Sequence, residues 1–192
     1  MITLDVIQEC KNGKHLGQTK LFDAYVNQMF NICFRYMKRD DLAEDMLSQG
    51  FARVFANIQR FEYKDELSLK SWIKKIMINE CLMELRKHTN FFLVSEEEAL
   101  ELGKMDYNLE KLDAEYIYQA ILTLPTGYRT VLNLNIIEGF SHAEIAEMLS
   151  INEGTSRSQL NKARKLLKEK LSEETNRYER RRVWQDIKGQ DL

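Results

Sequence analysis

The chain has 192 residues, a formal net charge of −2 at pH 7 and a hydrophobic content of 44%. This length suits one large domain or two small ones, and the composition is that of a packed protein. With eight glycines and one proline, the sequence favours a mostly helical fold and argues against a Rossmann or barrel enzyme. Because the net charge is slightly negative, any contact with nucleic acid must come from local basic patches.

Several classes of function lack their usual sequence signals. No apolar run approaches about 18 residues and the N-terminus lacks a signal-peptide pattern, so we expect a cytoplasmic protein without membrane insertion. The three histidines do not stand at metal-ligand spacing with cysteines or carboxylates, and His142 reads as an exposed helix residue. Glycine-rich phosphate loops and nucleophile motifs are also missing. We therefore expect no enzyme, no cofactor, no metal and no small-molecule substrate.

The first half of the chain predicts three helices. Apolar residues at helical spacing predict an amphipathic helix over residues 19–37. A second helix begins at Asp40-Asp41 and carries an apolar side. After a polar connection over residues 61–69, a third helix runs to Lys87. Positions 70–90 contain five basic and two acidic residues. Taken alone, this third helix is a core helix with a basic flank.

The middle of the chain changes composition. Between positions 94 and 115 there are eight acids and two lysines, a pattern that resists packing and marks a domain boundary. Beyond Leu171 five bases balance five acids. We therefore predict a helical domain over residues 1–92, an acidic linker over 93–115, a second helical domain over 116–172 and a charged tail over 173–192.

Residues 122–170 predict a helix-turn-helix. Leu124-Pro125 opens a helix whose apolar side includes Ile136, and Gly139 ends it. The segment 141–144 (Ser-His-Ala-Glu) is a capping box for the next helix. After the turn at Ser150-Ile151, Asn152 can cap the last helix.

The last helix, predicted over residues 153–170, has two faces. Leu160, Ala163 and Leu167 form its inner stripe, and residues 154–170 hold six bases against one acid. Long donors near the start of a second helix are what major-groove reading requires. A solvated basic face on an ordinary bundle helix is the alternative. The outward-facing donors are Arg157, Ser158, Asn161, Lys162, Arg164 and Lys165.

Two segments here closely resemble the DNA-binding region of bacterial RNA polymerase sigma factors, LPTGYRTVLNLNIIEGFSHAEIAEML and EGTSRSQLNKARKLLKEKL. The match is best to the extracytoplasmic-function group. The resemblance implies that the outward-facing donors read the minus-35 element, with Arg164 and Lys165 mainly on phosphates. The sequence departs from the family pattern at Ser150, where Gly is usual, and at Ser156, where a β-branched apolar residue is usual.

Two further segments resemble the other half of these sigma factors. LAEDMLSQGFARVFANIQRF is similar to the segment that binds the clamp helices of the polymerase's largest subunit. SWIKKIMINECLMELRK is similar to the helix that melts and reads the minus-10 element, although an Asp common near Met83 is missing. By this resemblance the loop before Trp72 captures an extruded base. The implied minus-10 residues are Lys75 and Asn79, and the implied polymerase-binding residues are Asp45, Ser48, Gln49 and Phe55.

The resemblance covers about residues 19–87 and 122–171. It implies an all-α protein of two small helical domains that binds core RNA polymerase, directs it to promoter DNA and assists opening. An anti-sigma factor would be a further partner. The alternative is a stand-alone helix-turn-helix repressor or activator, whose N-terminal domain would dimerise or sense a ligand.

Overall fold

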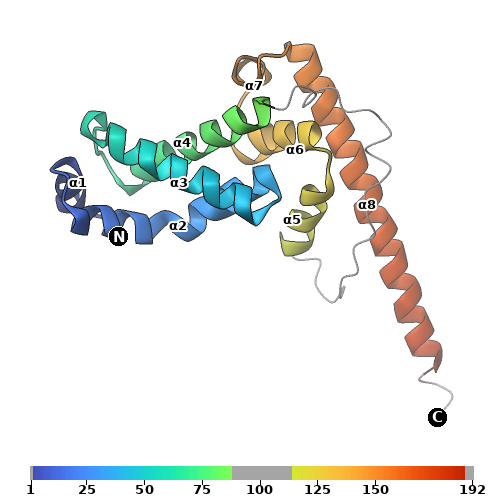
Figure 1. The fold of residues 1–192 in the computed structure, drawn as a ribbon. Coiled ribbons are helices and arrows are strands. Elements are labelled where there is room, and N and C mark those ends of the chain that lie inside the picture. The colour runs from blue at the N-terminus through green and yellow to red at the C-terminus, as the bar shows by residue number, and fades with distance from the viewer. Residues whose placement is uncertain (1, 88–113, 189–192) are drawn as a thin grey trace. The chain divides into compact units, whose positions relative to one another are not determined.

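The computed structural model describes residues 2–87 and 114–188 (Figure 1). Within these ranges the chain forms helices and no strand, so the predicted all-α class is confirmed. The chain divides into two compact units, Met1–Thr89 and Asn90–Leu192, and each is described by itself. The predicted acidic linker lies outside the described residues, apart from its last two positions, which begin the first helix of the second unit.

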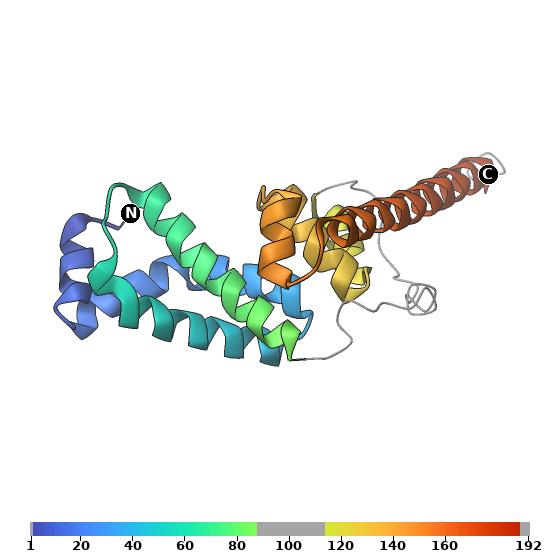
Figure 2. The same cartoon turned by 90° about the horizontal axis from the view of Figure 1, so that it is seen from above.

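Three long helices that pack on one another build the first unit, and a short helix covers one of them (Figure 2). The helices are α1 (Leu4–Lys11), α2 (His15–Met37), α3 (Asp40–Asn57), a 3₁₀ turn η1 (Ile58–Arg60) and α4 (Glu66–Arg86). Helix α4 begins before the predicted Leu69 because Asp65 caps it. The Asp65 carboxylate accepts from the Ser68 amide at 2.6 Å, and the Ser68 hydroxyl accepts from the Asp65 amide at 3.1 Å.

The core of the first unit lies among α2, α3 and α4. Met29, Val54 and Met77 are fully buried, one from each helix. Cys33 and Cys81 are also fully buried, and neither forms a disulfide. A hydrogen bond with Cys33, together with burial, raises the pKa of the Cys81 thiol well above its ordinary value. A thiol of this kind is unreactive and acts as a small apolar core group.

The second unit packs α6 and α7 against the long α8. Its elements are α5 (Ala114–Thr123), α6 (Thr126–Leu132), a π-helical turn η2 (Asn133–Ile137), α7 (His142–Leu149) and α8 (Glu153–Lys188). Helix α8 extends well past the predicted end near Lys170. The sequence explains this, because neither Gly nor Pro occurs between Leu171 and Lys188 to end a helix.

The π-helical turn corrects one core prediction. Ile136 was expected on the buried side of the first helix, yet its side chain is about half exposed, while Leu134 is fully buried. A π turn holds more residues than an α turn, so side chains after Leu132 are rotated away from the 3.6-residue pattern.

Arg129 is buried in the second unit and is only 1% exposed. Its Nη1 donates to the carbonyl of Leu124 at 2.8 Å, which ties the middle of α6 to the residue before Pro125. Burial lowers the pKa of Arg129 to about 10.

Candidate nucleic-acid interface

The predicted turn chemistry orients α7 and α8. The Ser141 hydroxyl accepts from the Glu144 amide at 3.3 Å, and the Glu144 carboxylate accepts from the Ser141 amide at 2.8 Å. Ser150 adopts a left-handed conformation with φ 54°, which explains why Gly is usual here in the sigma pattern. Asn152 then caps α8, because its Oδ1 accepts from the Thr155 amide at 2.7 Å.

A polar contact joins the two helices of the motif. The Ser156 hydroxyl on α8 is fully buried and lies 2.8 Å from His142 Nδ1 on α7, within hydrogen-bonding distance. The prediction that His142 is an exposed helix residue is therefore wrong, since its side chain is half-buried against α8. The two residues are 14 positions apart, so local sequence signals did not pair them.

The outer face of α8 is basic and exposed. The sequence-predicted donors all lie on it, and each is exposed: Arg157, Ser158, Asn161, Lys162, Arg164 and Lys165. Their inner neighbours Leu160 and Ala163 are buried. Arg157 forms an ion pair with Glu153, one turn earlier on the same helix. A hollow of about 400 Å³ at the start of α8 also brings Tyr128 of α6 beside Ser158 and Lys162, which the sequence did not predict.

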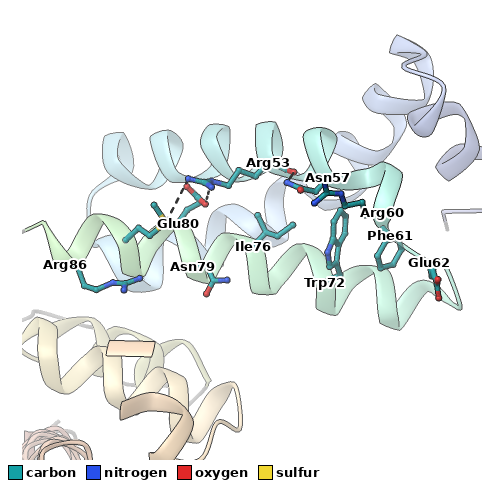
Figure 3. A pocket seen from close by; sticks show the side chains of 11 residues that line it. Arg53, Asn57, Arg60, Phe61, Glu62, Trp72, Ile76, Asn79, Glu80 and Arg86 are labelled. Atoms are coloured by element: carbon teal, nitrogen blue, oxygen red, sulfur yellow. Dashed lines mark hydrogen bonds and ion pairs between the residues drawn. The ribbon is translucent and has the colours of Figure 1, made fainter. Parts of the chain in front are cut away.

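An open groove of about 810 Å³ lies between α3 and α4 in the first unit (Figure 3). Asn79 lines it, whereas Lys75, one turn earlier on α4, is exposed outside the set of lining residues. The other lining residues were not predicted as site residues, except that Trp72 was named beside the expected base-capturing loop. They are Arg53, Asn57, Arg60, Phe61, Glu62, Trp72, Ile76, Glu80, Met83 and Arg86.

The two ends of the groove differ in chemistry. At one end Phe61 and Trp72 stack, with ring centroids 4.5 Å apart and planes 24° from parallel. Arg86 lies at the other end, and an ion pair between Arg53 and Glu80 crosses from α3 to α4 between them (Figure 3). A basic groove with an aromatic platform and amide donors is suited to a single nucleic-acid strand.

The predicted polymerase-binding residues lie on α3. Asp45, Ser48 and Gln49 are exposed, and Phe55 is half-buried, with its ring centroid 6.1 Å from that of Phe51. Ser48 and Phe55 are two turns apart, so they share a side of the helix. Asp45 and Gln49 stand on the same i, i+4 row of α3 as Arg53 and Asn57, so this exposed side of the helix adjoins the groove.

The described residues contain neither a membrane-spanning helix nor a metal-binding cluster. Among them, no helix combines the length and apolarity needed to cross a membrane. No cluster of three or more His, Cys, Asp or Glu side chains that could hold a metal ion occurs in residues 2–87 and 114–188.

Comparison with known proteins identifies both units. Residues 21–91 match the family described as Sigma-70 region 2, and residues 114–167 match Sigma-70, region 4. The ECF RNA polymerase sigma factor SigW of Bacillus subtilis is 28% identical over 178 residues, covering 86% of this chain and 94% of the relative. The ECF RNA polymerase sigma-E factor of Haemophilus influenzae is 24% identical over 179 residues, covering 86% and 93%.

A solved structure is also similar, the sigma factor RpoE in complex with the anti-sigma factor NepR from Bartonella quintana. Its TM-score is 0.49 at 22% identity, covering 80% of this chain and 96% of that one. The two matched family regions follow each other in order and together span more than half of the chain. These two family matches favour the predicted sigma factor over the stand-alone helix-turn-helix regulator. The chain belongs to the extracytoplasmic-function sigma factors of the sigma-70 family, non-enzymatic initiation factors that bind RNA polymerase and direct it to promoters.

Proposed function

We propose that this sigma factor divides initiation among three surfaces. Residues 1–92 would bind polymerase and the minus-10 element, and residues 116–172 would bind the minus-35 element. Residues 93–115 would connect the two and 173–192 would form a tail. The observation that carries this proposal is the groove between α3 and α4, because it combines arginines, stacked aromatic rings and amides in one place.

Helix α8 is the proposed minus-35 reader. Arg157, Ser158, Asn161 and Lys162 are exposed near the start of the helix, where a recognition helix meets base edges. Arg164 and Lys165 are exposed farther along and would hold phosphates. The Glu153–Arg157 ion pair limits the orientations of the Arg157 guanidinium before DNA arrives.

Helix α4 is the proposed minus-10 helix, and its groove would hold the separated strand. Stacking on an aromatic platform offsets part of the cost of unpairing a base. Asn79 supplies an amide inside the groove, and Lys75 supplies a cation one turn earlier. Both residues would therefore act in opening rather than in the first encounter with duplex DNA.

The exposed side of α3 is the proposed polymerase contact. Asp45, Ser48 and Gln49 are polar and exposed, and the partly exposed ring of Phe55 adds an apolar contact. Such a face would suit an interface in which the aromatic ring is buried and the polar side chains form the rim.

Three variants test the division of labour on a promoter selected by the holoenzyme. Asp45→Lys should reduce core-polymerase binding. Arg157→Ala should leave core binding intact and relax base preference at one minus-35 position by about 1–3 kcal/mol. Asn79→Ala should leave core-polymerase binding and minus-35 base preference intact. It should reduce transcription from a duplex promoter, and transcription should recover on a pre-melted promoter. If Asn79→Ala were equally impaired on duplex and pre-melted templates, the opening role would be refuted.

Two further expectations concern partners and place. Core polymerase and promoter DNA lie in the bacterial cytoplasm, so we propose that the protein acts there. We also propose control by an anti-sigma factor, as the sigma-factor resemblance implies. Such a factor should co-purify with the tagged full chain and block its binding to core polymerase.

A further inference from the structure

The ion pair between Arg53 and Glu80 is unusual for its burial. Glu80 is 4% exposed, whereas Arg53 is 53% exposed and lines the groove. A buried carboxylate without a cation is costly, so Glu80 keeps the Arg53 guanidinium beside it. A long, half-exposed arginine is thereby fixed in one place on the groove wall (Figure 3).

The known contacts of Arg53 use only part of its hydrogen-bonding capacity. Arg53 Nε pairs with a Glu80 oxygen, and Nη2 lies 4.0 Å from Met83 Sδ, a weak acceptor. A guanidinium has five N–H donors in a fixed plane, so its terminal nitrogens keep donors for a ligand in the groove. Arginine donors in this arrangement suit an oxyanion such as a phosphate.

We propose that Arg53 binds a backbone phosphate of the unpaired promoter strand and that Glu80 is the positioning residue that holds Arg53 for this contact. The proposal rests on the proposed role of the α3–α4 groove in holding that strand. The stacked pair Phe61–Trp72 would then take a base at one end of the groove, while Arg53 takes phosphate along its wall. Arg53 would contribute to affinity for any sequence rather than to base preference.

The test uses the full chain assembled with core polymerase. The probe is a labelled single-stranded oligonucleotide that the wild-type holoenzyme selects from a random pool, and its Kd is measured over a range of salt. Arg53→Met should weaken binding about ten-fold, the usual scale for losing a charged hydrogen bond. The slope of log K against log salt should become shallower by about 0.7, the value for one phosphate contact on a single strand.

A matched control separates this contact from general charge loss. Arg39→Met removes an arginine that pairs with Asp41 on the exposed start of α3, outside the residues that line the groove. It should leave the salt slope unchanged. A variant in which Met replaces Arg53 and Leu replaces Glu80 removes the pair together, which avoids a lone buried acid and protects folding. This double variant should show the same shallow slope as Arg53→Met.

The positioning role has its own readout. Replacing single phosphates of the probe with neutral methylphosphonates should reveal one position that weakens wild-type binding and leaves Arg53→Met unaffected. In Glu80→Leu, a methylphosphonate at that position should likewise have no effect on binding, although Arg53 is still present. We call the loss of affinity that this neutral phosphate causes in the wild type the phosphate coupling. If Glu80 had only a structural role, a Glu80→Leu protein that still binds core polymerase would show the same phosphate coupling as the wild type.

Each result is decisive. If Arg53→Met kept the wild-type salt slope and phosphate profile, the proposal would be overturned. If Asn79→Ala weakened strand binding in that same experiment, the proposed role of the groove would survive. If neither variant had any effect, the proposed minus-10 role of α4 would fall with it.

Discussion

Gly50 on α3 faces the side chain of Met77 on α4, and replacing it should disturb the packing of these two helices. A Cβ atom at Gly50 would lie 2.2 Å from Met77 Sδ and 2.9 Å from Met77 Cε. Met77 is fully buried, so its side chain cannot move aside into open space. Gly50→Ala must therefore force Met77 from its rotamer or push the two helices apart.

The size of the effect follows from two opposing terms. Overpacking a core typically costs about 1–3 kcal/mol. In the interior of a helix, alanine stabilises the folded state by about 0.5–1 kcal/mol relative to glycine. We therefore expect Gly50→Ala to lower the free energy of unfolding of this unit by about 1 kcal/mol. Urea unfolding followed by Trp72 fluorescence, in a Trp184→Phe background, measures it.

A second background supplies the control. Met77→Ala alone should cost about 2–5 kcal/mol, because it leaves a cavity. Adding Gly50→Ala to Met77→Ala should then stabilise the protein by about 0.5–1 kcal/mol, since the clash is gone and the helix preference remains. The sign of the Gly50 effect should thus reverse between backgrounds. Stabilisation by Gly50→Ala beside the native Met77 would refute the steric reasoning.

Two other predictions concern buried polar groups. Ser156→Val should cost about 1–3 kcal/mol, because it leaves His142 half-buried without its partner, and adding His142→Leu should recover part of that loss in thermal melts. Burial, with a smaller effect of Glu66, raises the pKa of Tyr25 from 10.0 to about 12, and its hydroxyl has no hydrogen-bond partner among the described residues. The unfolded chain therefore loses this proton first, so stability should be fully present below pH 10 and fall as pH rises toward 12. Tyr25→Phe should remove much of that decline in denaturation measured across this range, and a variant with the wild-type decline would contradict this reasoning.

The helix-turn-helix could be predicted because its determinants are local. The capping box at Ser141 and Glu144 spans three positions, and Asn152 caps an amide three residues later. Gly139 ends its helix with a φ of 83°, as its residue type implies. Signals of this kind do not depend on the rest of the fold.

The groove could not be predicted in the same way, because its residues come together only after α3 and α4 pack. Arg53 and Glu80 are far apart in sequence, and although each lies in a segment that resembles the sigma factors, no local spacing pairs them. The π-helical turn is a second example, because it shifts burial from Ile136 to Leu134 against the helical period. Both differences arise from tertiary packing rather than from local preference.

Two departures from the sigma pattern have a common structural explanation. Ser156 replaces an apolar residue, and His142 on the neighbouring helix bonds to its hydroxyl. Met83 stands near a position where Asp is common, and Glu80, one turn earlier, supplies a carboxylate to Arg53, the same arginine that Met83 contacts. In each case a polar contact joins two helices at or beside the position that departs from the pattern. A comparison with the family pattern position by position finds two departures, whereas the packed helices show that a hydrogen bond or an ion pair between helices accompanies each of them.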